Sequence, residues 1–314
     1  LGLPGNPPAA VAALTDKLRF RELQRSLGLP HPEFATVADP SDPAVLPAFP
    51  VVVKARRLNA SRGVIRADDA EQLAQAQQRV RRIQARVERE AGSPLVERFI
   101  PGAEAALDGV LRDGTLTVLA VFDKPDPLDG PYFEETLFVT PSRLPEVMQA
   151  IFAASVEKVC RAAGITEGVV HAEARINEAD VYLLEVAPRG IGGLCGRVLA
   201  STLGMTSAEI VLRDALGLPL PQLSQGRAAG VMMIPIPAAG IFRGVDGTDV
   251  ARAVPDITGI DITAHPGQLV APPPEGACYL GFLFSSAATP AAAEAALRDA
   301  HAQLAVHIQP LVEP

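Results

Sequence analysis

The sequence predicts an α+β protein, and three observations support this prediction. The block from residue 51 to 100 runs as strand, loop, strand, helix and strand. Residues 103–124 form a hairpin around Asp113-Gly114, which is a strong two-residue turn signal. Two further apolar, β-branched runs flank a polar turn cluster at 177–180, and each run carries one glutamate.

The composition is that of a globular protein without a nucleic-acid or membrane signature. Of 314 residues, 48% are hydrophobic and 20% are charged, so we expect two or three compact units. The net charge of −8 argues against nucleic-acid binding through bulk charge. The sequence contains no apolar run of roughly 18 residues and no signal peptide. Three scattered cysteines (Cys160, Cys195 and Cys278) fit no zinc or disulfide pattern, so we expect a cytoplasmic protein.

The first 102 residues divide into two predicted units. Residues 9–28 form a helix that ends at Gly28, and an extended, Pro-rich connector follows. We therefore expect an N-terminal helix and connector at 1–48. The next unit, at 49–102, is small enough to be a lid. Its predicted elements are a strand at 49–55, a loop at 56–63, a short strand VIRA, a polar helix capped by Asp68 or Asp69, and a strand at 93–100.

The remaining residues divide into a core unit at 103–220 and a C-terminal α+β unit at 221–314. The core unit holds the hairpin and the two glutamate strands. Its other elements are an acidic, exposed loop at 125–136 and helices at 142–163, 194–203 and 206–216. A linker at 217–230 leads to strands near 231–236, 241–245 and 278–284 and to an Ala-rich helix at 290–307.

The two glutamates are Glu173, in GVVHAEARI, and Glu185, in VYLLEVAPRGIGG. A hairpin centred on Ala179 places them directly opposite each other, with Cβ atoms about 4.5–5.5 Å apart, where like charges repel. A divalent cation such as Mg²⁺ would offset this repulsion. The alternative is a hairpin with an offset register and two solvated acids. His171 faces Ala187 in the same register, and we expect it to lie in the core or behind the ligands.

Other charged residues at strand ends are candidates for binding. Lys54 ends a strand and precedes an Arg-rich loop that could cradle phosphates, although such a lysine is also often only solvated. Lys17 is by itself a surface lysine of the first helix. Glu97 opens ERFIPGAE, which is either an ordinary strand end or a hinge for a purine, with Glu104 near the ribose. Arg189 precedes a Gly-rich turn, where binding groups are commonly displayed, although a simple ion pair is the alternative.

Five motifs in order give the sequence a family resemblance. They are DKLRFRELQRSLGLPHP, PVVVKARRLNASRGV, LVERFIPGAE, HAEARI and YLLEVAPRGIGG. In this order they resemble the ATP-grasp superfamily over nearly all of residues 1–217. The PGNPP opening, the EVAPR-GG ending and the tail after Gly230 look most like the L-amino acid ligase branch. The resemblance implies an ATP-grasp fold, in which two α+β subdomains clasp ATP, followed by a C-terminal α+β subdomain.

The resemblance also implies roles at the matching positions. Lys17 and Lys54 would contact ATP phosphates, and Lys54 and Arg189 would be catalytic. Glu104 would hold the ribose, and Glu135 would face the substrate amine. The remaining implied positions are the lid loop at Ser61, Arg62 and Gly63; the adenine site at Glu97, Arg98, Phe99 and Ile100; the Mg²⁺ ligands Glu173 and Glu185, with Mn²⁺ as a substitute; and the substrate residues Arg189, Gly192 and Gly193.

The sequence departs from the family pattern at several places. Ala187 stands where many members have Asn, and the lid loop LNASRG carries less glycine than usual. Leu137-Phe138 replaces a Gly-His that often follows the acidic residue of the substrate loop. The N-terminal Rossmann-like domain that normally precedes this region has no counterpart here. We therefore expect either a fragment of a longer protein or a short family member.

The resemblance implies an ATP-dependent carboxylate–amine ligase that forms an amide or peptide bond through an acyl phosphate, acting on amino acids. Its partners would be a small-molecule carboxylate and a small-molecule amine, and the protein could be a homodimer. One alternative is a ligase that uses formate or bicarbonate. Another is a nucleotide-binding module without turnover.

Overall fold

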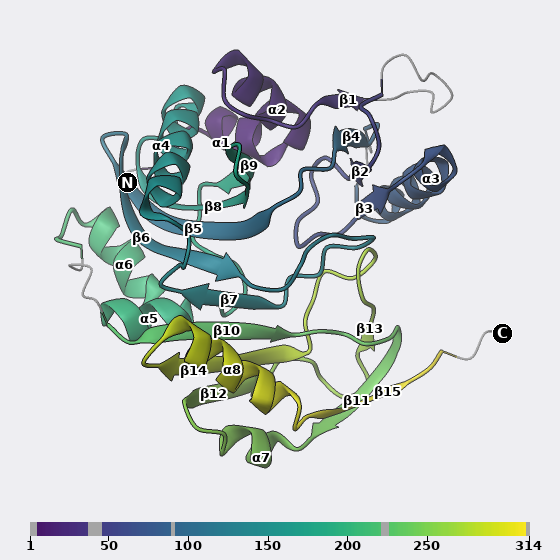
Figure 1. The fold of residues 1–314 in the computed structure, drawn as a ribbon, viewed down its shortest axis with the longest axis vertical. Coiled ribbons are helices and arrows are strands. Elements are labelled where there is room, and N and C mark those ends of the chain that lie inside the picture. The colour runs from purple at the N-terminus through teal and green to yellow at the C-terminus, as the bar shows by residue number, and fades with distance from the viewer. Residues whose placement is uncertain (1–4, 37–45, 89–91, 221–225, 312–314) are drawn as a thin grey trace.

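The computed structural model describes residues 5–36, 46–88, 92–220 and 226–311 (Figure 1). Pro4 of the PGNPP opening, residues 37–45 of the connector, the predicted end of the polar helix at 89–90 and residues 221–225 of the linker lie outside these ranges. Within them, no helix combines the length and the apolar character needed to cross a membrane.

The predicted lid is a small antiparallel sheet covered by one helix. The strand order is β1 (Phe34–Thr36), β4 (Leu95–Arg98), β2 (Val51–Lys54) and β3 (Val64–Ala67), and the helix is α3 (Ala70–Val87). The side chain of Asp69 accepts a hydrogen bond from the Gln72 N–H and so caps α3. The apolar residues of α3 then pack on Val51 and Val53 in a separate core. The predicted order of elements at 51–100 is confirmed, while β1 lies in the segment predicted as connector.

A second, eight-stranded sheet runs through the rest of the molecule, and its neighbouring strands are all antiparallel. Its order is β12 (Ile257–Ile262), β14 (Gly281–Ala287), β10 (Ala228–Ile234), β7 (Leu137–Thr140), β6 (Thr115–Lys124), β5 (Ala103–Arg112), β8 (Gly168–Ile176) and β9 (Val181–Ala187). The hairpin predicted at 103–124 is confirmed, and Asp113 and Gly114 both have positive φ, as a two-residue turn requires. The boundary predicted at residue 220 between the core unit and the C-terminal unit falls between β7 and β10 in the sequence. These two strands pair, so both predicted units contribute strands to one sheet.

Helices cover both faces of the large sheet (Figure 1). One face packs against α1 (Pro8–Thr15), α2 (Lys17–Ser26) and α4 (Glu146–Ala163). The other packs against α5 (Arg197–Leu203) and α6 (Ser207–Ala215). Strand β5 serves both cores because its side chains alternate: Leu107 faces the first core and Ala106 the second.

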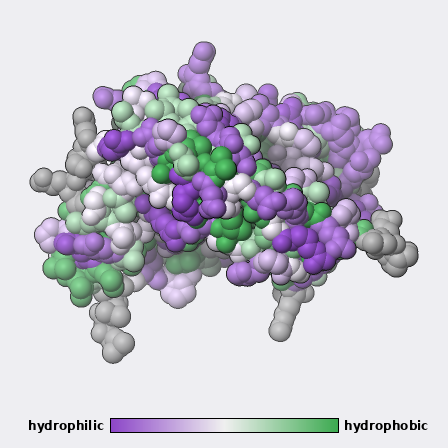
Figure 2. All heavy atoms as spheres, turned by 90° about the horizontal axis from the view of Figure 1, so that it is seen from below, coloured by the Kyte–Doolittle hydropathy of each residue, from purple (hydrophilic) through white to green (hydrophobic). Residues whose placement is uncertain are grey.

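The C-terminal residues extend the large sheet and add a small one. The small sheet has the order β13 (Leu269–Val270), β11 (Gly240–Asp246) and β15 (Ala305–Gln309), and the helices are α7 (Thr248–Arg252) and α8 (Pro290–His301). Figure 2 views the molecule from this side, where hydrophilic and hydrophobic side chains are interspersed. Val250 and Leu269 are among the exposed apolar residues of these elements.

Several predicted elements are corrected by the structure. The helix predicted at 9–28 is two helices, because Asp16 has extended backbone angles and its side chain caps α2 at the Leu18 N–H. The helix predicted at 290–307 ends at His301, and the residues after it pair with β11 as β15. Strand β10 begins inside the predicted linker. Strand β7, strands β12 and β13 and helix α7 were not predicted.

Candidate active site

The hairpin of β8 and β9 brings Glu173 and Glu185 opposite each other, as predicted. The turn pairs Ile176 with Val181, and this register alone would oppose Glu173 to Leu184. A β-bulge at Leu184 shifts the register by one residue and restores the Glu173–Glu185 pair. His171 faces Ala187 in the same register, also as predicted.

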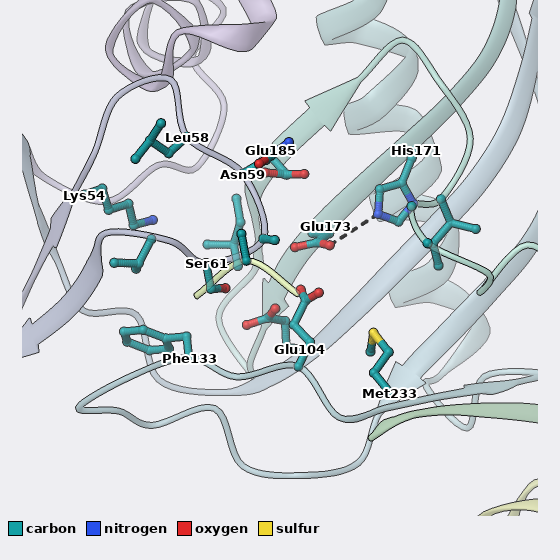
Figure 3. Close-up of a pocket in the computed structure, with 18 of the residues that line it drawn as sticks. Lys54, Leu58, Asn59, Ser61, Glu104, Phe133, His171, Glu173, Glu185 and Met233 are labelled. Carbon is teal, nitrogen blue, oxygen red and sulfur yellow. Dashed lines mark hydrogen bonds and ion pairs between the residues drawn. The ribbon is translucent and has the colours of Figure 1, made fainter. Parts of the chain in front are cut away.

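A cavity of about 580 Å³ lies between the lid sheet and the large sheet (Figure 3). Most of the predicted site residues converge on it. Those that line it are Lys17, Lys54, Ser61, Glu97, Arg98, Phe99, Ile100, Glu104, Glu135, Glu173, Glu185, Arg189, Gly192 and Gly193. Arg62 and Gly63 do not line the cavity. Gly63 instead lies under α3, and its N–H donates to the carbonyl oxygen of Pro274 at 2.9 Å.

Glu97 holds the side chain of Lys54 in place at the lid end of the cavity. Its carboxylate lies 2.7 Å from Lys54 Nζ and 2.7 Å from Arg21 Nε, and Arg21 is fully buried. Burial alone would raise the pKa of Glu97, but the positive charges of Arg21 and Lys54 lower it to about 2. The sequence pattern did not reveal Arg21, which reaches this site from α2.

Lys17 begins α2 and points across the loop that follows Lys54. Its ammonium donates to the Leu58 carbonyl oxygen at 2.6 Å. Burial lowers its pKa, and the nearby Glu185 carboxylate acts in the opposite direction. Lys17 therefore lies near Glu185, and both lysines line the same cavity as the two opposed glutamates.

The predicted adenine segment has one free backbone donor. The Arg98 N–H donates to the Glu33 carbonyl oxygen and the Phe99 N–H to the Pro50 carbonyl oxygen. The Ile100 N–H has no hydrogen-bond acceptor among the described residues. It is therefore the donor that this segment can offer to a ligand.

His171 is buried behind Glu173. Its Nδ1 lies 2.7 Å from Asp108 Oδ1, and its Nε2 lies 3.2 Å from Glu173 Oε1 (Figure 3). Burial would lower the pKa of His171, but hydrogen bonds to the two carboxylates raise it to about 10. His171 therefore lies in the core behind Glu173, where it was predicted, and contacts one oxygen of that carboxylate.

Lys124, which the sequence did not single out, joins three acids at this site. Its Nζ lies 2.8 Å from Glu104 Oε1, 2.6 Å from Glu135 Oε1 and 3.1 Å from Glu173 Oε2. Burial and the Glu173 carboxylate raise the pKa of Glu135 to about 8, against the influence of Lys124. Glu135 was predicted in an exposed loop, yet its side chain is only 17% exposed.

The donor set at the hairpin fits a hard divalent cation. Glu173, Glu185 and His171 each offer a ligand atom, and these atoms lie within 4.8 Å of one another. Glu185 makes no ion pair or hydrogen bond through its side chain with the described residues, so its carboxylate is available. Because Mg²⁺ and Mn²⁺ prefer carboxylate oxygens, the two glutamates are the ligands that either ion would use.

The wall of the cavity that faces the lid includes C-terminal residues that the sequence did not reveal. Arg189, on this side, is exposed and donates to the Gly190 carbonyl oxygen at 2.8 Å. The apolar part of the wall comes from several separate segments, so no local pattern could have indicated it. It comprises Phe138, Ile191, Cys195, Met233, Tyr279 and Phe282.

Two family models match the sequence in the regions that build this site. The model for the ATP-grasp domain matches residues 47–198, which include the lid and both glutamate strands. The model for L-amino acid ligase C-terminal domain 2 matches residues 232–309. Residues 47–198 are therefore an ATP-grasp domain. The ATP-grasp fold predicted from the five ordered motifs is confirmed.

Several known proteins are similar to this chain. The L-amino acid ligase from Bacillus licheniformis superposes with a TM-score of 0.81 at 26% identity, over 99% of this chain and 76% of that one. Carnosine synthase 1 of Gallus gallus is 34% identical over 144 residues, which are 45% of this chain, and the match spans only 15% of that protein. A D-alanine–D-alanine ligase of Synechococcus sp. (strain JA-2-3B'a(2-13)) is 26% identical over 238 residues, or 69% of each chain.

Proposed function

We propose that this ATP-grasp protein is an ATP-dependent carboxylate–amine ligase that forms an amide or peptide bond, with amino acids as substrates. One observation supports this function most strongly. A single cavity between the two sheets gathers two lysines, two opposed glutamates and an arginine beside a Gly-rich turn. Cations, carboxylates and glycine backbone are the groups that bind a nucleotide triphosphate with its metal.

The lid side of the cavity would bind the nucleotide. Lys54, held in place by Glu97, and Lys17, held by the Leu58 carbonyl oxygen, would contact phosphate oxygens. The free Ile100 N–H would donate to the purine, and Glu104, which lines the same cavity, would face the ribose. Mg²⁺, or Mn²⁺ in its place, would bind Glu173 and Glu185 and would screen the charge of the phosphates.

The proposed reaction has two steps. A carboxylate oxygen attacks the γ-phosphorus of ATP, the bond from that phosphorus to the β–γ bridging oxygen breaks, and ADP leaves. An amine nitrogen then attacks the acyl carbon of the acyl phosphate, inorganic phosphate leaves, and the nitrogen loses a proton. Activation is needed because a free carboxylate has no adequate leaving group.

The chain's own residues would mainly position reactants and balance charge. Arg189 carries a planar fork of donors suited to the acyl phosphate. Burial and the Glu173 carboxylate raise the pKa of Glu135, so its ionised form is a stronger base than an ordinary carboxylate and would accept the proton of the amine. The lid and the segment at 277–279, which also lines the cavity, would exclude water, which otherwise hydrolyses the acyl phosphate.

The names of the relatives support amino-acid substrates. An L-amino acid ligase and a D-alanine–D-alanine ligase are both named for joining amino acids. The apolar lining near Glu135 would suit a side chain of similar character on one substrate.

The test is release of inorganic phosphate from Mg·ATP with a pooled set of amino acids. We expect release to require an amino acid and to fall by about 10²-fold or more in Glu185→Gln. Lys158→Gln is the control, because Lys158 is exposed and bonds only the Leu27 carbonyl oxygen among the described residues. Release with formate or bicarbonate, but not with amino acids, would contradict the proposed substrates. ATP binding without release in any mixture would instead indicate a nucleotide-binding module.

A further inference from the structure

Lys124 lies at the centre of three carboxylates. It is the last residue of β6, and its side chain is only 2% exposed. Glu104 is its direct partner in the β5–β6 register, while Glu135 and Glu173 come from the loop before β7 and from β8. One ammonium has three N–H donors, and Lys124 has one carboxylate oxygen within 3.1 Å for each of them.

The three carboxylates differ in the partner of the oxygen that does not contact Lys124. Glu104 Oε2 accepts from Arg175 Nε at 3.1 Å, and Glu173 Oε1 accepts from His171 at 3.2 Å. Glu135 Oε2 has no hydrogen-bond partner among the described residues. Of the six oxygens, one oxygen of Glu135 is therefore left facing the cavity without a protein donor.

Without Lys124, three carboxylates this close to one another could bind a divalent cation. The ligand atoms of Glu104, Glu135 and Glu173 lie within 4.8 Å of one another, as do those of Glu173, Glu185 and His171. Glu173 thus belongs to two potential cation sites. Lys124 fills the first with a fixed positive charge, and the second has no lysine in contact with Glu185 among the described residues.

We propose that Lys124 is a positioning residue that stands in the place of a second divalent cation. It confines metal binding to the Glu173–Glu185 side, and it holds Glu135 so that one carboxylate oxygen points to the amine. This inference rests on the proposed function for the role of Glu135. Its metal-binding part concerns the protein alone.

The first experiment compares Mn²⁺ affinities by electron paramagnetic resonance, without ATP or substrates. The proteins are wild type, Glu185→Gln, Glu135→Gln and the control Lys158→Gln. We expect Glu185→Gln to weaken Mn²⁺ binding by about tenfold or more, while Glu135→Gln stays within about twofold of wild type. Equal weakening in Glu135→Gln and Glu185→Gln would overturn the proposal, because Glu135 would then be a metal ligand.

The second experiment removes the internal cation. Lys124→Gln should bind about one additional Mn²⁺ per chain, and the double variant Lys124→Gln/Glu135→Gln should lose it again. Mn²⁺ should also raise the unfolding midpoint of Lys124→Gln more than that of wild type. A folded Lys124→Gln with the wild-type Mn²⁺ count would overturn the proposal. Where Lys124→Gln does not fold, the Glu135→Gln comparison decides.

These readouts separate the two proposals. A protein that releases no phosphate, but shows the expected Mn²⁺ pattern, would contradict the ligase function and leave the role of Lys124 toward metal intact. A protein that releases phosphate with amino acids, but does not show the expected Mn²⁺ pattern, would support the ligase function and contradict the role of Lys124 toward metal.

Discussion

At the scale of single residues, the site is built from buried charges that neutralise one another. Glu97 shows the principle most clearly, since it lies between Arg21 and Lys54 and is 2% exposed. An unpaired carboxylate at such a depth would be strongly unfavourable, so the two cations are a condition for its ionised form. In return, Glu97 holds Lys54 at the cavity.

This pairing predicts a pH-dependent stability. The pKa of Glu97 is lowered from 4.5 to about 2 in the folded protein, so its contribution is present above pH 4.5 and is lost as the pH falls toward 2. We expect Glu97→Gln to be less stable than wild type at pH 7 by on the order of 3 kcal/mol. Urea unfolding at several pH values should show this difference shrinking below about pH 4.5. Glu178→Gln, at the exposed hairpin tip, is the control; a Glu97→Gln deficit that is constant with pH would contradict the assignment.

At the scale of elements, two β-bulges decide which charged side chains meet. In the β5–β6 hairpin, the turn alone would oppose Glu104 to Asp123, whereas the bulge opposite Asp108 and Gly109 opposes it to Lys124. In the β8–β9 hairpin, the bulge at Leu184 opposes Glu173 to Glu185. Each bulge converts one pairing register into another, so each moves a complete row of side chains.

The turn before β3 has left-handed backbone at Ala60, Ser61 and Gly63, and only the last of these is a glycine. Gly63 has a φ of 68°, and a Cβ there would lie 3.0 Å from the Ala55 Cβ. We expect Gly63→Ala to destabilise the protein by about 1–3 kcal/mol and to weaken nucleotide binding, because the turn carries Ser61.

Gly28→Ala is a matched control for this prediction. Gly28 has a φ of 63°, and a Cβ added to it would have no atom within 4 Å, so it shares the backbone strain without the contact. Urea unfolding of both variants separates the two effects. Equal losses of unfolding free energy would show that the contact with Ala55 contributes nothing.

At the scale of the whole molecule, Pro274 and Glu275 of the C-terminal unit bind the lid through hydrogen bonds and an ion pair. Arg79 of α3 pairs with both oxygens of Glu275, at 2.7 and 2.8 Å, and donates to the Tyr132 hydroxyl at 2.5 Å. The Gly63 N–H donates to the neighbouring Pro274 carbonyl oxygen. A loop far along the chain therefore contacts both the lid helix and the lid turn above the cavity.

Removal of this contact should loosen the lid more than it changes global stability. We expect Glu275→Ala to lower the unfolding free energy by only about 0.2–1 kcal/mol, because the pair is partly exposed. Proteolysis within residues 56–63 and nucleotide dissociation should both become faster. Glu209→Ala removes a comparable Arg213 pair inside α6 and should leave both rates unchanged. Unchanged rates in Glu275→Ala would show that the contact does not hold the lid.

The sequence by itself determined the features that depend on local periodicity and turn chemistry. These include the order of elements in the lid, the Asp113-Gly114 hairpin, and a glutamate on each strand of the next hairpin. Ordered motifs then indicated the ATP-grasp fold, and most of the site residues predicted with them line the cavity. Alternating apolar positions and turn residues act over a few positions, so their pattern can be read along the chain.

Only the tertiary structure decided the partners of the buried charges and the wall opposite the lid. Lys124 meets Glu104 through the bulged β5–β6 register, His171 meets Asp108 across β5 and β8, and Arg21 reaches Glu97 from α2. Residue 16 interrupts the first helix because Asp16 binds Arg56 of the lid, and β15 forms because β11 offers it an edge. Such contacts join residues distant in sequence, where no local spacing specifies which side chains will be neighbours.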